Sequence, residues 1–211
     1  MRKSVYIFII AIMSSFAINA QEITVNDNIA IKIKKVKKAP ILFYTQQNIK
    51  VKGDGAEKIM IKSKIRSLNK KDVDVNPFSL LDTVNKVRYK LVEFVGYKPV
   101  SVVVATYQGK QLLKTKLVNK SGRPYKNLPN YDPEIKDSFY DYKFEGYTDF
   151  APKVNFGTDK KPIVSEIYYA PITMNSFVAD AFFAVHKFDS EPFFQLYYGN
   201  DKVADIKVDL D

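Results

Sequence analysis

The sequence predicts an all-β fold, an antiparallel β-sandwich, on three observations. Short runs of alternating apolar and polar residues recur along most of the chain, as expected for strands with one buried face. Residues that favour turns separate these runs. No long stretch shows the spacing of an amphipathic helix. Such a succession of short strands favours a sandwich over a parallel α/β arrangement.

The first 20 residues have the pattern of a secretory signal peptide. Two basic residues precede an apolar run over residues 5–12, which is too short for a membrane span. We expect cleavage after Ala20, with Ala17 as the alternative, which leaves one domain over residues 21–211. The chain has no Cys, so it is not a lipoprotein and has no disulfides. We expect a secreted or periplasmic protein with no membrane span after cleavage.

The first strands are expected in a basic region. Residues 29–36 alternate apolar and basic side chains until Lys35 shifts the phase, which predicts a strand with a bulge or an end at that point. Residues 48–52 and 57–66 flank Gly53-Asp54-Gly55, whose residues accept turn conformations. The two runs are therefore predicted to form a hairpin.

The middle of the chain contains three further strand-like runs. Residues 78–82 and 87–91 predict two strands joined by a short loop, and Arg88 and Lys90 fall on the polar side of the second. Residues 99–107 are almost continuously β-branched, which is typical of a strand covered on both faces.

The C-terminal stretch has the strongest strand pattern. Residues 177–185 place alternate apolar side chains on one face. Residues 193–198 and 202–210 flank Gly199, so we expect them to form a hairpin.

Between these regions, residues 119–162 break the pattern with prolines among many Tyr, Phe and Asp residues. A connection this long is a functional loop, a small packed excursion or a flexible segment. Asp132 followed by Pro133 is a good helix start, and Ile135 with Phe139 would form the buried stripe of one short helix. The sandwich is therefore expected to carry one long Tyr/Asp/Pro-rich excursion containing a short helix.

Three runs, residues 74–82, 87–91 and 193–208, resemble the immunoglobulin-like domains of unknown function found in exported bacterial proteins. The resemblance implies an immunoglobulin-like sandwich and non-enzymatic work, and no site can be carried over from it. The chain departs from true immunoglobulins because it has neither Cys nor Trp.

Few residues suit catalysis or metal binding. His186 is the single histidine, so with no Cys the sequence excludes metal sites that need two imidazoles or a thiolate. It has no Gly-x-Ser-x-Gly elbow for a serine nucleophile and no phosphate-binding loop. We therefore predict no catalytic residue, no metal and no cofactor.

Positive charge is concentrated in the N-terminal third. Residues 30–71 hold thirteen Lys and Arg against two acids, within a chain whose formal charge is +10. Lys62, Lys64 and Arg66 would project from one strand as a ridge of roughly 13 Å. Such a ridge suits a polyanion such as an acidic glycan, lipopolysaccharide phosphate or nucleic acid, the last not expected outside the cytoplasm. The alternative is a solvated face whose lysines prevent aggregation.

The excursion offers a second candidate site. Tyrosines on a loop give amphipathic contact area for a sugar ring or a protein, and nearby carboxylates add polar contacts. The candidate ligand-binding residues are Tyr131, Tyr140, Tyr142, Tyr147, Asp137 and Asp141. The alternatives are that these aromatics pin the excursion to the sandwich, or that two carboxylates of residues 132–149 serve a carbohydrate hydrolase.

From the sequence we expect an exported, non-catalytic binding or structural module of the bacterial cell envelope. Its partner would be an envelope glycan or another envelope protein. A carbohydrate hydrolase and a polyanion binder are the alternatives.

Overall fold

The computed structural model describes residues 21–38, 56–101, 105–123, 129–155, 160–187 and 192–208, and these residues are all-β with no helix. Accordingly, this part of the chain contains no helix long and apolar enough to cross a membrane. The predicted signal peptide lies outside the described residues. The strands are β1 (Ile23–Val25), β2 (Ile29–Lys38), β3 (Ala56–Ser67), β4 (Phe78–Asp82), β5 (Val87–Pro99), β6 (Ala105–Gln108), β7 (Gln111–Leu113), β8 (Asn130–Tyr131), β9 (Thr148–Phe150), β10 (Val154–Asn155), β11 (Val164–Ser165), β12 (Tyr168–Tyr169), β13 (Ser176–His186), β14 (Phe193–Tyr198) and β15 (Asp201–Lys207).

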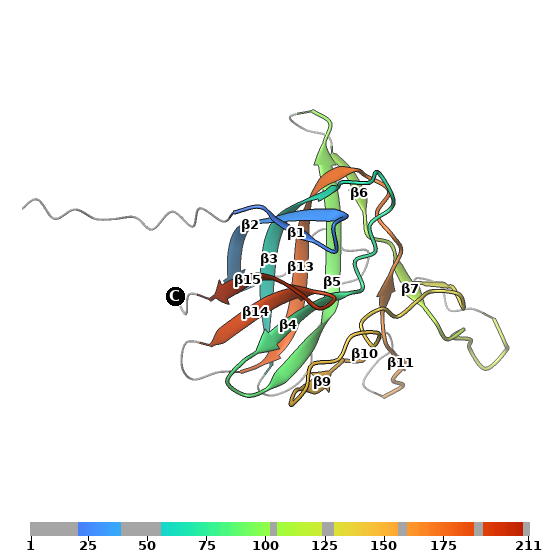
Figure 1. The fold of residues 1–211 in the computed structure, drawn as a ribbon. Helices are drawn as coiled ribbons and strands as arrows, with labels where there is room; N and C mark the ends of the chain where they lie inside the picture. The colour runs from blue at the N-terminus through green and yellow to red at the C-terminus, as the bar shows by residue number, and fades with distance from the viewer. Residues whose placement is uncertain are drawn as a thin grey trace, which may run out of the picture.

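One large sheet organises the molecule. Its strand order is β1-β2-β3-β13-β5-β4-β14-β15, with β6 and β9 also paired to β5. The sheet curls until β15 lies against β1 and β2 (Figure 1). At this junction the backbone amide of Asn26 donates a hydrogen bond to Asp201 Oδ2 at 2.7 Å. The all-β class that the alternating strands predict is confirmed, and the architecture is consistent with a β-sandwich or a barrel.

The core lies on the inner side of this curled sheet. On β13, the alternation predicted from the sequence is confirmed: Phe177, Ala179, Ala181, Phe183 and Val185 are all buried in the main core cluster. This strand is hydrogen-bonded to β3 on one side and to β5 on the other. Its inner side chains therefore sit at the centre of the apolar contacts.

Several local predictions are confirmed. β14 and β15 form the expected antiparallel hairpin, and Gly199 in its turn has φ +61°, a conformation that glycine adopts without strain. On β2 the register shifts between Ile33 and Lys35, where the pattern predicted a bulge or an end. Residues 57–66 lie within β3, whereas the other arm and the turn of that predicted hairpin lie outside the described residues.

The prediction of one continuous strand over residues 99–107 is wrong. β5 ends at Pro99, and β6 returns antiparallel beside it with Ala105 opposite Pro99. Val100, expected to be covered, is 66% exposed. Proline has no amide N–H to continue a ladder, so a run of β-branched residues around it indicates strand propensity but does not exclude a reversal.

The excursion is a set of short strands and turns. β7 pairs with β8 and β12 in a small sheet, β10 pairs with β11, and β9 runs parallel to the start of β5. The short helix expected after Asp132 is absent, because residues 132–141 form turns. Asp132 Oδ1 accepts a hydrogen bond from the Glu134 amide at 3.0 Å, the contact expected of an N-cap, but no helix follows it.

Candidate functional site

Two cations of β5 are buried under the excursion. Alternation on β5 puts Tyr89 in the core and turns Arg88 and Lys90 to the opposite, outer face of the sheet. Arg88 is nevertheless only 1% exposed and Lys90 only 4%. Charged side chains are rarely buried unless they are paired, so their partners define what holds this region together.

Arg88 binds the returning chain of the excursion. Its Nε and Nη2 donate to the two carboxylate oxygens of Asp149 at 2.6 and 2.9 Å, a bidentate pair. Its Nη1 donates to the carbonyl oxygen of Tyr142 at 2.5 Å, and its guanidinium lies 4.0 Å from the centre of the Phe139 ring. One side chain thus anchors three points of residues 139–149.

Lys90 binds a second part of the excursion. Its Nζ donates to Asp137 Oδ2 at 3.0 Å and to Glu166 Oε2 at 3.1 Å. The same ammonium lies 4.5 Å from the centre of the Tyr168 ring and 5.2 Å from that of Tyr140. We call the group formed by Arg88, Lys90, Asp137, Asp149 and Glu166 the buried ion-pair cluster.

The structure brings three of the six candidate ligand-binding residues together. Asp137, Tyr140 and Asp141 line a pocket of about 730 Å³ on the surface of the excursion. The remaining lining residues are Lys114, Pro133, Glu134, Ile135 and Lys136.

The other three candidate tyrosines lie elsewhere. The Tyr142 ring covers Gly199, where an added Cβ would lie 2.9 Å from the ring. Tyr147 packs edge-on against Phe144 and under Lys86, at centroid distances of 6.2 and 5.2 Å. Tyr131 is 47% exposed on β8. Tyr142 and Tyr147 thus make packing contacts, which are the contacts expected if these aromatics pin the excursion to the sandwich.

We expect the phenol of Tyr140 to lose its proton at a higher pH than an ordinary tyrosine. Burial, helped by the negative charges of Glu166 and Asp137, raises its pKa to about 12. Because a tyrosine in an unfolded chain titrates near pH 10, this group should make folded stability fall as pH rises from about 10 to 12. The measurement is the phenolate absorbance of the wild type minus that of Tyr140→Phe. If the titration that disappears in Tyr140→Phe has its midpoint near pH 10, the environment described for Tyr140 is wrong.

The predicted basic ridge lies on the outer face of β3. Register extends it onto β2, because Lys32 lies directly opposite Lys64 and Lys35 opposite Lys62. Cross-strand partners point to the same side of a sheet. We call Lys32, Lys35, Lys62, Lys64 and Arg66 the basic face.

The members of the basic face differ in their partners. Lys62 lies 3.7 Å from Asp180, and its hydrogen bond with Tyr97 raises the pKa of Lys62 although burial opposes the shift. Arg66 pairs with Glu22 at 2.5 Å. Among the ion pairs of the described residues, none involves Lys32, Lys35 or Lys64.

Two tyrosines that the sequence analysis missed lie beside the basic face. Val178 of β13 is the partner of both Lys64 and Tyr97, and Tyr97 is the partner of Tyr107 on β6. The order Lys32, Lys64, Val178, Tyr97, Tyr107 is therefore one row across five strands, which we call the lysine–tyrosine row. The two lysines lie near opposite ends of the basic region, residues 30–71, and the tyrosines lie in the β5–β6 hairpin, so no spacing in the sequence marks the four residues as neighbours.

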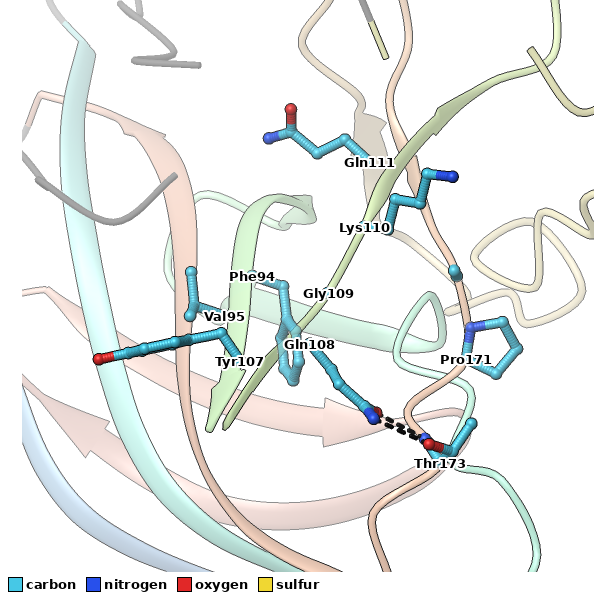
Figure 2. A pocket seen from close by; sticks show the side chains of 10 residues that line it. Phe94, Val95, Tyr107, Gln108, Gly109, Lys110, Gln111, Pro171 and Thr173 are labelled. Atoms are coloured by element: carbon cyan, nitrogen blue, oxygen red, sulfur yellow. Dashed lines mark hydrogen bonds between the residues drawn. The ribbon is translucent and has the colours of Figure 1, made fainter. Parts of the chain in front are cut away.

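A second pocket, of about 340 Å³, lies at the tyrosine end of this row. Gln108 closes one side, because its Nε2 donates to Thr173 Oγ1 and its Oε1 accepts from the Thr173 amide, both at 2.8 Å (Figure 2). The lining residues are Phe94, Val95, Tyr107, Gln108, Gly109, Lys110, Gln111, Ala170, Pro171 and Thr173.

Comparison with protein-family models, with curated proteins and with solved structures finds no match to this chain.

His186, the remaining candidate for catalysis, is held in contacts with neighbouring aromatic side chains. His186 Nδ1 lies 3.0 Å from the Tyr89 hydroxyl, and its ring packs edge-on against Phe150 at 4.8 Å. Across the part of the chain that the structure describes, no group of three His, Cys, Asp or Glu side chains is placed to hold a metal ion. The features that offer a ligand contact area are thus the two pockets and the basic face.

Proposed function

We propose that this protein is an exported, non-catalytic binding module of the bacterial cell envelope, and that it holds an anionic polymer on the basic face. The observation that carries the proposal is the placement of Lys32 opposite Lys64 and of Lys35 opposite Lys62. Like charges directly opposite each other destabilise a sheet, and a polyanion would remove that repulsion.

Protection of a sheet edge accounts for only part of this charge. β1 pairs with β2 only over Ile29–Ile31, so the lysines that follow on β2 lie where edge lysines are useful. Lys62 and Lys64, however, belong to β3, which is paired with β2 on one side and β13 on the other. Edge protection gives no reason for lysines at these two interior positions.

The carbohydrate hydrolase is the weaker proposal. Two of its candidate carboxylates, Asp137 and Asp149, each neutralise a buried cation of β5. Moving either away from its cation would leave a buried charge uncompensated, which is unfavourable. This arrangement supports a role in attaching the excursion rather than in proton transfer to a substrate.

Export and the immunoglobulin-like family are proposals that rest on the sequence. The secretory signal expected over residues 1–20 supports a secreted or periplasmic location, and the resemblance to immunoglobulin-like domains supports a non-enzymatic role. Export is tested by recovery of the chain from the periplasm or medium and by the position of its new N-terminus.

The polyanion proposal is tested by retention on a heparin matrix. Lys32→Ser/Lys64→Ser should elute at clearly lower salt than the wild type, because fewer cations displace counterions from the polymer. The matched control is Lys116→Ser/Lys120→Ser, which removes the same charge from exposed positions after β7. Equal shifts for the two pairs would mean that only net charge matters, and the proposed site would be lost.

A further inference from the structure

The lysine–tyrosine row changes chemistry along its length. Lys32 and Lys64 form one end, and Tyr97 and Tyr107 form the other, with Val178 between them. Four interstrand spacings of about 4.8 Å make the row roughly 19 Å long. A ligand lying across the strands would meet cations first and aromatic rings afterwards.

The tyrosine end presents a ring to the solvent. Tyr107 is 54% exposed, and its ring centroid lies 6.0 Å from that of Tyr97 at an interplanar angle of 37°. Tyr97 in turn lies under Lys62, whose Nζ is 5.6 Å from the ring centre. The two rings therefore extend the basic face with amphipathic, flat area of the kind on which a sugar ring or a base can stack.

Two rows of the sheet lead into the pocket beside Gln108. The lysine–tyrosine row ends at Tyr107, and the adjacent row, Lys35, Lys62, Asp180, Val95, ends at Val95. Both terminal residues line the 340 Å³ pocket. Its volume is at the lower end of the range of small-molecule sites, which is enough for one ring of a polymer.

The pocket lining combines the ammonium group of Lys110 with groups that both donate and accept hydrogen bonds. The amide of Gln108 and the hydroxyl of Thr173 each donate and accept, and their mutual hydrogen bonds hold both in place while leaving further capacity (Figure 2). A phosphate oxygen uses only donors, whereas a sugar hydroxyl uses both functions.

A single-stranded nucleic acid fits the row less well. Such ligands are held by aromatic side chains spaced along a basic groove, so that successive bases stack. Here the two rings lie together at one end of the row, and Lys32 and Lys64, which form no ion pair among the described residues, lie at the other.

We infer that the polymer held on the basic face is an anionic polysaccharide, with its carboxylate or sulfate groups on Lys32 and Lys64 and one sugar ring on Tyr107. This inference rests on the proposed function. It adds the class of the ligand and a sugar subsite at Tyr107.

The test compares two polyanions on the purified full chain at one salt concentration. Heparin supplies sugar rings and negative charge, and inorganic polyphosphate supplies negative charge alone. Tyr107→Ala should weaken heparin binding by roughly tenfold, as loss of one stacking contact does, and leave polyphosphate binding within about twofold. Tyr107→Phe, which keeps the ring, should retain heparin binding.

Tyr131→Ala is the matched control, because it removes a similarly exposed tyrosine from β8 and should change neither affinity. Equal losses for both polyanions in Tyr107→Ala, or no loss for either, would overturn the sugar subsite while leaving the polyanion proposal standing. Failure of the wild type to bind either polymer would instead overturn the proposed function. Tighter, Tyr107-dependent binding of a single-stranded oligonucleotide would identify the polymer as nucleic acid.

Discussion

Replacing Arg88 with alanine is expected to lower the free energy of unfolding by about 3–5 kcal/mol, the usual cost of breaking a buried ion pair by removing one partner. Arg88 is 1% exposed, and its loss leaves Asp149 and the Tyr142 carbonyl without their donors. Chemical denaturation, with linear extrapolation to water, measures the change. Because Arg88 anchors residues 139–149, proteolytic cleavage in that segment should also become faster.

Two further variants separate the geometry of Arg88 from its charge. Arg88→Lys keeps the charge but cannot form the bidentate pair, so it should remain clearly destabilised. Lys86→Ala, two residues earlier, removes an exposed cation that lies 5.2 Å from the Tyr147 ring and should cost less than about 1 kcal/mol. An Arg88→Ala protein as stable as Lys86→Ala would show that the buried ion-pair cluster does not hold the excursion.

A comparably large loss of stability, about 3–5 kcal/mol, is expected for Phe183→Ala at the centre of β13. Phe183 is fully buried between the strands that flank it, β3 and β5, and its removal leaves a cavity in the main core cluster. The same denaturation measurement applies. A loss below about 1 kcal/mol would mean that the inner face of the sheet is not the packed core described.

Phe193→Ala is the matched control for this substitution. It makes the same chemical change on β14, but Phe193 is 39% exposed. Its cost should be less than about 1 kcal/mol, since little apolar surface returns to water. Similar losses for the two variants would indicate that burial does not set the cost.

The strands themselves were largely predictable from the sequence. Residues 177–185 bury the alternate side chains that their pattern predicts, residues 193–198 form the predicted first strand of a hairpin, and Lys35 marks the register shift of β2. These features depend on a period of two residues, which the backbone imposes on any strand. The helix predicted after Asp132 does not form, although Asp132 Oδ1 accepts a hydrogen bond from the Glu134 amide as an N-cap would, so an N-cap contact alone does not predict a helix.

The burial of Arg88 and Lys90 was not predictable in the same way. Alternation correctly separates them from Tyr89, but a polar side of a strand is not necessarily exposed. The excursion covers that side and supplies the acids and rings that make burial of two cations acceptable. These partners lie far from β5 in the sequence, so no local pattern indicates that they contact Arg88 and Lys90.

The sequence by itself determined which segments form strands, which side chains share a face of each strand, and that positive charge gathers in the N-terminal third. Only the tertiary structure decided that Lys32 and Lys64 share a row with Tyr97 and Tyr107, and that this row ends at a pocket. The physical reason is that backbone geometry decides which side chains of one strand share a face, whereas register decides which residues of neighbouring strands lie side by side. Register in turn depends on how distant segments bury their apolar faces together.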